Sequence, residues 1–330
     1  MNKLMKVLIT TVPFAEKNLL PIELLKGIDA DFLINPLNRR LKEEELAEIA
    51  SDFDIIIAGT EPITDFVMEK ATKLKLISRV GIGLDSVDLL AAEKRGVKVS
   101  YTPDAPAPAV AELTIGLLIT LLRSAQLSNI DMHNGNWNRY FGKRIANSTI
   151  GIIGLGRIGS RILTRLSVFG TPRLLVNDIA PNPELDRKFK LEWVDKETIY
   201  READIISLHV PLTKLTKDMI TKKHLEMMKS DAAIINTSRG GIVNELDLYN
   251  LMKQGYLSGA AIDVFEKEPY IGPLSEINRC ILTAHMGSMS IDCRTRMEVE
   301  ATEEVVRFVK NIPLENEVPE EEYNVQRHNF

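Results

Sequence analysis

The sequence has 330 residues, of which 45% are hydrophobic and 26% are charged. This is an ordinary globular composition in a chain too long for one hydrophobic core, so we expect two domains. The net charge of −5 provides no basic surface for nucleic acid or for an anionic membrane, and we expect neither as a partner. The two cysteines, Cys280 and Cys293, form no disulfide framework or metal-ligand pattern. They favour a reducing, cytoplasmic setting, and no metal site is predicted.

Neither a leader nor a membrane span is predicted. The first apolar run is short and is followed by Pro13 and Glu16, which indicates a β-strand rather than a signal peptide. The apolar stretch at residues 113–122 has about half the length that a bilayer requires, and it ends at Arg123. It is therefore predicted to be a buried helix.

The first hundred residues alternate between short β-rich runs and helical patterns. The runs are "KVLIT", "DFLIN", "DIIIAG", "KLISRVG" and "VKVSYT", and clear helical patterns cover residues 41–52 and 85–96. Strands that alternate with helices at this spacing predict a parallel sheet covered on both faces.

A second array of the same kind begins after a proline-rich segment and an apolar helix that starts near Ala109. Its runs are "TIGII", "RLLVND", "ADIISLHVP", "AAIINTS", "GAAIDVF" and "CILTAH". A last helix, at residues 292–311, has no following strand, and we expect it to return to the first domain. The predicted domains are thus 1–103 with 286–330, and 104–285. The acidic end, "VPEEEYNVQRHNF", is predicted to be a partly ordered tail.

A glycine-rich loop opens the second array. Gly154, Gly156 and Gly159 follow an apolar strand and begin a helix, which is the setting in which this spacing binds a pyrophosphate. Asp178 lies about 20 residues further on, at the end of the next strand, where a carboxylate accepts hydrogen bonds from ribose hydroxyls. A 2′-phosphate would meet a like charge there, so the pattern predicts NAD rather than NADP. The alternative is a glycine-rich turn that binds no ligand.

Charged residues follow three more strands of this array. Arg239 stands in "NTSRGG", Asp263 and Glu268 in "DVFEKEP", and His285 in "TAHMGS". Each of them alone would be read as a surface charge, a cap or a buried hydrogen-bonding histidine. Because the carboxyl ends of parallel strands are where open α/β sheets bind ligands, all of them together indicate a functional site.

These motifs resemble the D-isomer-specific 2-hydroxyacid dehydrogenase family over almost the whole chain. "GIIGLGRIG", "LHVPLT", "NTSRGGIVNE", "DVFEKEP" and "TAHMGS" occur in the family's order and spacing, as do "RVGIGLDSVD" and "PAVAELTIGL". The resemblance implies two doubly wound parallel-sheet α/β domains with a cleft between them: a flavodoxin-like substrate domain and a Rossmann NAD domain. It implies Arg239, Glu268 and His285 as the catalytic residues and places Asp263 near the nicotinamide ring. The implied NAD-binding residues are Gly154, Gly156, Arg157, Ile158, Gly159, Asp178, His209, Pro211, Thr216, Thr237, Ser238 and Asp263.

The implied roles agree with the chemistry of hydride transfer. A proton must leave the hydroxyl group as hydride leaves its carbon, and His285 suits this because an imidazole ring can both accept and donate a proton. Glu268 would hold the tautomer of His285, and Arg239 offers a planar set of donors for an α-carboxylate. The resemblance also implies that the backbone of Val80, Gly81 and Gly83 binds the substrate carboxylate.

The substrate is less well defined by the sequence. The chain is similar to short phosphoglycerate dehydrogenases, in which Arg79 and Arg139 match basic positions used for a substrate phosphate. Ala58 and Glu61 depart from that pattern, and "PDAPAPA" lacks a common asparagine. A 2-hydroxy or 2-keto acid of the 3-phosphoglycerate type is therefore expected alongside glyoxylate or hydroxypyruvate, and an NAD-binding corepressor is a further alternative.

The resemblance also implies a homodimer. The apolar crossover helix, with Leu117, Leu118, Leu121 and Leu122, and the "NGNWNRYFG" segment after it match the family's dimer contacts. These leucines suggest more apolar surface than one domain face needs. The alternative is a helix buried within its own chain.

Overall fold

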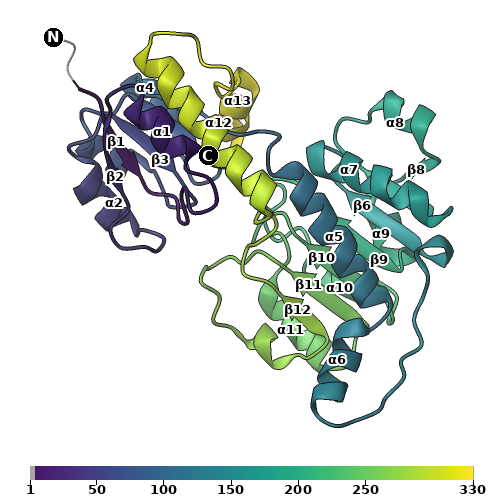
Figure 1. Cartoon of the computed structure of the whole chain (residues 1–330). Coiled ribbons are helices and arrows are strands. Elements are labelled where there is room, and N and C mark those ends of the chain that lie inside the picture. Colours follow the sequence, from purple (N-terminus) through teal and green to yellow (C-terminus); the bar gives the residue numbers. More distant parts are fainter. Residues whose placement is uncertain (1–3, 330) are drawn as a thin grey trace. The chain divides into compact units, whose positions relative to one another are not determined.

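The structure, a computed structural model, describes residues 4–329 and divides into two compact units (Figure 1). Unit 1 consists of the chain up to Pro106 and from Met289 onward, and unit 2 is Ala107–Ser288. The sequence predicted boundaries after residues 103 and 285, which is three residues before each boundary in the structure.

Unit 1 contains a five-stranded parallel sheet. Its strands are β1 (Lys6–Ile9), β2 (Asp31–Ile34), β3 (Ile55–Ala58), β4 (Leu76–Arg79) and β5 (Lys98–Ser100), in the order β2-β1-β3-β4-β5. The central strands β3 and β4 are buried at every position, as expected for apolar strands covered on both faces. This strand order is the flavodoxin-like one, in which the direction of winding reverses between β1 and β3.

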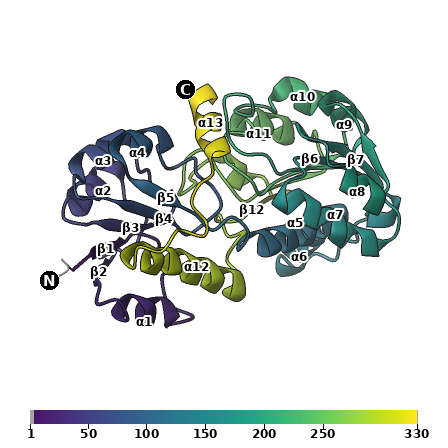
Figure 2. The same cartoon turned by 90° about the horizontal axis from the view of Figure 1, so that it is seen from above.

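Helices cover both faces of this sheet, as Figure 2 shows. One layer is formed by α1 (Leu20–Lys26) and α12 (Ile291–Val309), and the other by α2 (Glu43–Ala50), α3 (Asp65–Lys70) and α4 (Leu89–Arg95). Met297, Ala301 and Val305 of α12 pack in one cluster with strand residues of β1 and β3. The C-terminal part of the chain therefore completes the core of unit 1.

The acidic end of the chain is more regular than the sequence suggested. It forms α13 (Glu320–Asn329), which contacts α4, and the prediction of a partly ordered tail was wrong. Tyr323 packs against the apolar cluster of unit 1, and Gln326 and Arg327 bond to α4 and the loop before it. Such tertiary contacts stabilise a helix whose polar sequence carries little signal of its own.

Unit 2 contains a seven-stranded parallel sheet. Its strands are β6 (Thr149–Ile153), β7 (Arg173–Asn177), β8 (Leu191–Trp193), β9 (Ile205–Leu208), β10 (Ala233–Asn236), β11 (Gly259–Ile262) and β12 (Cys280–Leu282), in the order β12-β11-β10-β9-β6-β7-β8. The winding reverses between β6 and β9, which is the nucleotide-binding arrangement of a Rossmann sheet. The predicted α/β class with two doubly wound parallel sheets is confirmed; the short edge strand β8 was not predicted.

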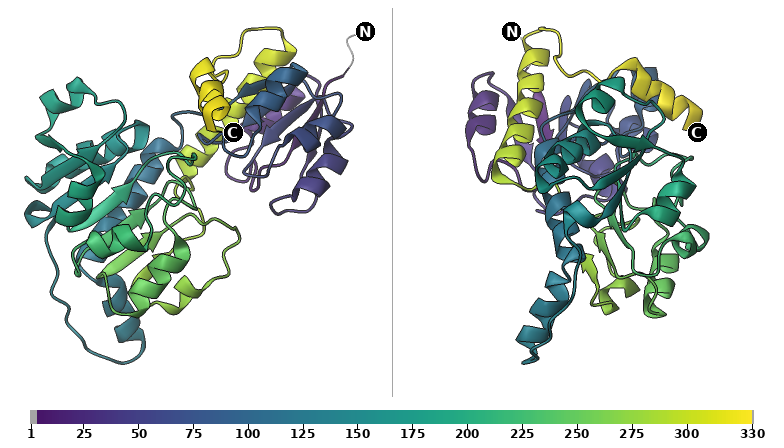
Figure 3. Two further views of the ribbon diagram at one scale, coloured as in Figure 1. Left: turned by 180° about the vertical axis from the view of Figure 1, so that it is seen from behind. Right: turned by 90° about the vertical axis from the view of Figure 1, so that its right-hand side faces the viewer.

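Two layers of helices also cover the sheet of unit 2. On one face lie α5 (Ala107–Leu122) and α7 (Arg157–Leu166), and on the other α9 (Lys196–Glu202), α10 (Lys222–Met227) and α11 (Glu245–Lys253). The short helix α8 (Pro183–Lys188) connects β7 to β8. After α6 (Ala125–His133) an extended segment, residues 134–144, returns to the sheet, and it is the long teal loop in Figure 3.

Among the described residues, no single helix is both long enough and apolar enough to cross a bilayer. Only α5 and α6 taken together reach that length and composition, and they are bent by 68° relative to each other.

Candidate active site

The glycine-rich loop lies at the carboxyl end of β6, where the winding of the sheet reverses. Gly154 has a φ of +97°, and a Cβ there would lie 2.4 Å from the carbonyl oxygen of His209, so the loop requires glycine at this position. No side chain caps the start of α7, and a Cβ on Gly156 would meet nothing within 4 Å. The backbone N–H groups at this helix end are therefore open to the phosphate groups of a dinucleotide.

Asp178 follows β7 and is fixed beside this loop by main-chain donors. Its Oδ2 accepts a hydrogen bond from the Leu155 amide at 2.6 Å, and its Oδ1 accepts one from the Ala180 amide at 2.9 Å. A carboxylate has about four acceptor positions, so both oxygens can still accept ribose hydroxyls. A carboxylate at the end of this strand can accept ribose hydroxyls and would repel a 2′-phosphate, so the arrangement fits NAD better than NADP.

His209 follows β9 and is held as a neutral imidazole. Its Nε2 lies 2.7 Å from the Ser207 hydroxyl, and burial lowers the pKa of His209 to about 3. In the loop that follows, the Thr216 hydroxyl donates to the Pro211 carbonyl at 2.6 Å, which closes a compact turn. His209, Pro211 and Thr216 thus lie beside the glycine-rich loop and bring no charge to it.

The remaining residues that were predicted to contact the cofactor lie at the same edge of the sheet. Arg157 and Ile158 form the first turn of α7, with Arg157 exposed. Thr237 and Ser238 follow β10 and are buried, and the Thr237 hydroxyl lies 2.9 Å from that of Thr114 in α5.

The loops after β11 and β12 bring Glu268 and His285 together. The Nδ1 atom of His285 lies 3.1 Å from Oε1 and 3.0 Å from Oε2 of Glu268. The two side chains are 36% and 21% exposed, so the pair is accessible without being fully solvated. A carboxylate on Nδ1 fixes the tautomer and leaves Nε2 as the ring nitrogen that can exchange a proton with a substrate.

The backbone of His285 has the unusual φ of +49°, and the buried side chain of Asp263 holds the loop in this form. The His285 amide donates to the Asp263 carbonyl at 2.8 Å. The Asp263 carboxylate accepts hydrogen bonds from the Thr283 hydroxyl at 2.5 Å and from the amides of Met286 and Gly287 at 2.9 Å each. Sequence reasoning selected Asp263 but missed Thr283, although it precedes His285 by only two positions.

Arg239 lies in the loop after β10, which a second network holds. The Asn236 side chain accepts from the amide and the hydroxyl of Ser238, and it donates to the Arg239 carbonyl at 2.8 Å. Arg239 itself donates to the Ser238 carbonyl at 2.6 Å. A Cβ on Gly240 would lie 1.9 Å from the backbone of Phe265, so glycine lets this loop touch the loop that carries Glu268.

The loop after β4 in unit 1 contains the residues predicted to bind the substrate carboxylate. Two of its amides already have partners, because Val80 donates to the Ala58 carbonyl at 2.9 Å and Gly81 donates to the Thr102 hydroxyl at 2.8 Å. They therefore hold the loop on the sheet.

The next two amides of this loop, those of Ile82 and Gly83, donate to no acceptor within residues 4–329. Arg79 is 4% exposed and donates from Nε and Nη2 to the Gly83 carbonyl at 3.0 and 2.8 Å. Its guanidinium group thus fixes the loop that presents the two amides.

Arg139 is not brought to the carboxyl edge of the sheet in unit 2. It is exposed on the segment of residues 134–144, which is anchored by Lys143 through bonds to Asp204 and Asp231 at 2.9 and 3.0 Å. Asp204 directly precedes β9 and Asp231 lies two residues before β10, at the amino edge of the sheet.

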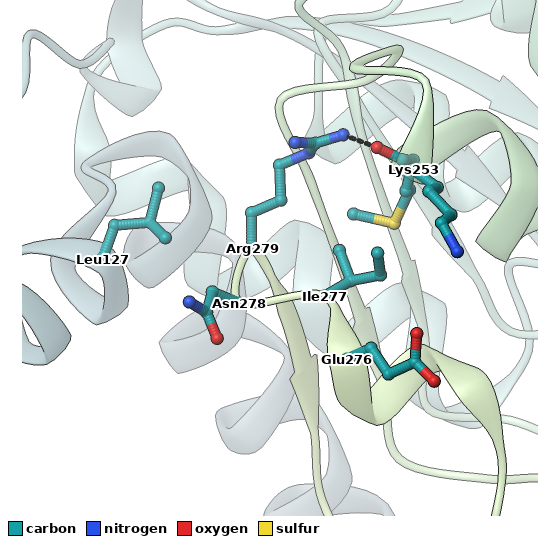
Figure 4. Close-up of a pocket in the computed structure, with 7 residues that line it drawn as sticks. Leu127, Lys253, Glu276, Ile277, Asn278 and Arg279 are labelled. Atoms are coloured by element: carbon teal, nitrogen blue, oxygen red, sulfur yellow. Dashed lines mark hydrogen bonds between the residues drawn. The ribbon is translucent and has the colours of Figure 1, made fainter.

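A pocket in unit 2 lies at that same amino edge (Figure 4). It is lined by Leu127, Glu276 and Arg279, among others, and Arg279 donates to the Met252 carbonyl across it. Arg279 directly precedes β12, whereas His285 follows that strand, so this pocket is separate from the histidine loop. Within residues 4–329 no cluster of His, Cys, Asp and Glu is arranged to hold a metal ion.

The comparisons with known proteins agree with this geometry. The sequence pattern of the family described as "D-isomer specific 2-hydroxyacid dehydrogenase, NAD binding domain" matches residues 115–287. The chain is 34% identical to a hydroxypyruvate reductase of Thermotoga maritima over 82% of this chain and 89% of that protein. The chain belongs to the D-isomer specific 2-hydroxyacid dehydrogenase family. It is an NAD-dependent enzyme of that family, as the glycine loop and Asp178 predicted.

Other members of this dehydrogenase family differ in their named substrates. The chain is 36% identical to a D-3-phosphoglycerate dehydrogenase of Methanocaldococcus jannaschii, over 84% of this chain but only 54% of that longer protein. Among solved structures, a D-lactate dehydrogenase from Aquifex aeolicus complexed with NAD and lactic acid superposes with a TM-score of 0.85 at 26% identity, covering 95% of this chain and 98% of that one. Family membership therefore establishes the class of reaction and not the substrate.

Proposed function

We propose that the protein uses NADH to reduce a short 2-keto acid to the 2-hydroxy acid, with His285 as the proton donor. The observation that carries this proposal is the double contact of Nδ1 of His285 with the Glu268 carboxylate. With Glu268 on Nδ1, the imidazolium ring gives a proton from Nε2 to the carbonyl oxygen of the substrate. In the reverse direction the neutral ring accepts that proton from the hydroxyl group.

The bound cofactor would be held by the open amides at the start of α7 and by Asp178 at the ribose. When bound, NADH supplies the hydride for the substrate carbon. Asp263 acts through the loop, because its carboxylate holds Thr283 and the two amides that follow His285. We assign to it a positioning role.

Each unit contains a group that we propose as a donor to a substrate carboxylate. The amides of Ile82 and Gly83 supply main-chain donors, and Arg239 supplies a planar guanidinium group that also polarises the reacting carbonyl. Arg79 supports this function by holding the Gly83 carbonyl, so that the two amides remain directed away from the sheet.

An unphosphorylated substrate, such as glyoxylate or hydroxypyruvate, fits these residues better than 3-phosphoglycerate. Arg79 is buried, with Nε and Nη2 bonded to the Gly83 carbonyl, and Arg139 lies on the exposed segment at the amino edge of the sheet in its own unit. Ala58, at the end of β3, and Glu61, in the loop after it, provide no positive charge for a phosphate group. The phosphoglycerate alternative is favoured by one observation, the 36% identity to a relative with that name.

The test is the rate of NADH oxidation with glyoxylate, hydroxypyruvate, pyruvate and 3-phosphohydroxypyruvate. We expect the highest kcat/KM with an unphosphorylated 2-keto acid. If the phosphorylated compound is the best substrate, the phosphoglycerate alternative is correct. If none of them supports NADH oxidation, the proposed reaction is wrong and the corepressor alternative returns.

We further propose that two chains associate through the region around α6. Leu117 and Leu118 of α5 are buried in the apolar cluster of unit 2, whereas Leu121 and Leu122 are only partly buried against it. The first two leucines therefore add no free apolar surface, and the last two keep some.

The main support for a dimer comes from apolar side chains beyond α5. Met132, Trp137 and Phe141 are 52%, 74% and 104% exposed on α6 and the extended segment after it. Exposed aromatic side chains gathered in one region are typical of a subunit interface. Light scattering should give twice the 37.0 kDa chain mass, and a variant with Trp137→Ser and Phe141→Ser should give a monomer. A monomeric wild-type protein would reject the proposal.

A further inference from the structure

Glu61 is a buried carboxylate at the carboxyl edge of the sheet in unit 1. It is 2% exposed, and its Oε1 accepts hydrogen bonds from the Gly59 amide at 2.8 Å and from the hydroxyl of the equally buried Thr10. Gly59 makes room for the second oxygen, since a Cβ there would lie 2.8 Å from Oε2 of Glu61. The side chain is thus fixed in one position.

That position is where a sheet of this topology binds a ligand. Thr10 directly follows β1 and Gly59 directly follows β3, the two strands between which the winding reverses. Ligands of open α/β sheets bind outside the carboxyl ends of the strands at this point. The neighbouring loop is the one after β4, because the Val80 amide bonds to the Ala58 carbonyl at 2.9 Å. Glu61 therefore borders the loop that we propose holds the substrate carboxylate.

Glu61 has no ion-pair partner among the described residues, and the guanidinium group of Arg40 in the same region donates to the Thr60 carbonyl instead. By contrast, the buried Glu298 in the same unit pairs with Arg294 at 2.7 Å. Both hydrogen bonds that Glu61 accepts from the described residues are to Oε1, so Oε2 has acceptor positions left.

A buried carboxylate without a cation is costly for a folded protein unless something else requires it. An ionised carboxylate only accepts hydrogen bonds, and it repels a second negative charge nearby. Next to the proposed binding loop, such a group would distinguish between substrates that carry different substituents beyond the keto carbon.

We propose that Glu61 is a specificity-determining residue that accepts a hydrogen bond from a hydroxyl group on carbon 3 of the substrate and excludes a phosphate there. The inference rests on the proposed reaction, and it names the substrate class as unphosphorylated 3-hydroxy-2-keto acids. The competing role of Glu61 is structural, as an acceptor that only ties the ends of β1 and β3 together.

The test compares substrates that differ at carbon 3. Hydroxypyruvate and pyruvate differ by the hydroxyl group alone, and 3-phosphohydroxypyruvate carries the phosphate in its place. Wild-type protein should prefer hydroxypyruvate over pyruvate in kcat/KM and should use the phosphorylated compound poorly. In Glu61→Gln the amide keeps an oxygen for Gly59 and Thr10 but loses the charge.

In Glu61→Gln the preference for hydroxypyruvate over pyruvate should fall about tenfold, since a hydrogen bond to a charged group is replaced by a neutral one. The kcat/KM for the phosphorylated compound should rise by a factor of about ten as the repulsion is removed. The kcat/KM for glyoxylate, which has no carbon 3, should change by less than about twofold by the same reasoning.

The matched control is Glu304→Gln, which neutralises another buried carboxylate of unit 1. Glu304 bonds to the amides of Glu315 and Asn316 after α12 and not to the ends of β1 and β3, so the substrate ratios should not move. Unchanged ratios in Glu61→Gln, with a lower Tm, would show a purely structural role and overturn the inference. If Glu61→Gln does not fold, a wild-type protein that fails to prefer hydroxypyruvate over pyruvate overturns it equally. Failure of the proposed reaction is distinct, because wild-type protein would then not oxidise NADH with glyoxylate either.

Discussion

The two sheets follow the same construction rules, yet their carboxyl edges are chemically different. The edge in unit 2 carries charged side chains that bond to each other or to their own loops, as in the pair of His285 and Glu268. The edge in unit 1 presents the amides of Ile82 and Gly83 and the unpaired carboxylate of Glu61. Proton transfer needs titratable groups in fixed contact, and unit 2 provides such a pair. Substrate recognition needs donors and acceptors that are not fully used within the protein, and the edge of unit 1 provides these. Unit 2 is therefore suited to the chemical step and unit 1 to the selection of substrates. Substitution of the proton-transferring pair in unit 2 should therefore lower kcat, whereas substitutions at the edge of unit 1 should change KM and substrate ratios.

The largest effect should come from breaking the chemistry of unit 2. We expect His285→Ala to lower kcat by about 10²- to 10⁴-fold, the usual contribution of general acid–base catalysis. Binding of NADH, measured by fluorescence titration, should be nearly unchanged. Arg239→Ala should lower kcat and raise KM together, because it removes both carbonyl polarisation and carboxylate binding. Near-normal kcat in His285→Ala would remove the basis for assigning the chemistry to unit 2.

The free energy of unfolding should depend on pH through His209, which follows β9 at the carboxyl edge of the sheet in unit 2. Burial lowers the pKa of His209 to about 3, below its value of about 6.5 in an unfolded chain. The stability linked to a depressed pKa is complete above the unfolded value and is lost as the pH falls from there toward the folded value. Between about pH 7.5 and about pH 5 this group should lower the free energy of unfolding by about 2 kcal/mol.

Urea denaturation at the two pH values measures this loss, and His209→Gln is the variant that isolates it. Glutamine cannot gain a proton, so the variant should lose less stability than the wild type over the same interval. Other titrating groups contribute equally to both proteins and cancel in the difference. Identical pH dependence in the two proteins would mean that His209 accepts a proton in the folded state without cost.

A smaller effect is expected at the cofactor itself. Wild-type protein should prefer NAD over NADP at least tenfold in kcat/KM, since a 2′-phosphate would approach the charge of Asp178. Asp178→Ala and Asp178→Asn should both narrow the preference. Asparagine keeps one oxygen for the amide of Leu155 or Ala180, so it separates loss of charge from loss of loop order. Equal use of both cofactors by the wild type would contradict the role of Asp178.

The sequence predicted the sheets better than it predicted the loops. Apolar runs such as β3 and β10 are buried at every position, and burial on both faces leaves a strong signal in the sequence. The strand β8 and the helix α13 were missed because three residues at a sheet edge and a mostly polar helix carry no comparable pattern. Their formation depends on tertiary contacts.

In the candidate site, too, some features could be predicted from the sequence and others could not. The types and spacing of Arg239, Glu268 and His285 could be recognised, and the direct contact of His285 with Glu268 fits the expected geometry. The bonds of Asp263 and the burial of Arg79 depend on how loops distant in the sequence fold against each other. Such contacts have no periodicity from which they could be inferred.

The smallest effect should come from the C-terminal helix of unit 1, through Gln326. Its side chain accepts from the Leu89 amide at 2.9 Å and donates to the Val87 carbonyl at 2.8 Å, and these residues follow the loop that carries Ile82 and Gly83. Gln326→Ala should therefore lower the free energy of unfolding by about 1 kcal/mol and raise KM for the 2-keto acid a few-fold, with kcat unchanged.

The neighbouring Arg327→Ala is the matched control for Gln326→Ala. Arg327 pairs with Glu93 at 2.7 Å, but the two side chains are 36% and 49% exposed, and such a surface pair contributes little to stability. KM should stay at the wild-type value in this variant. If Gln326→Ala lowers kcat instead of raising KM, the loop of unit 1 takes part in the chemical step, and the division between a selecting unit and a reacting unit does not hold.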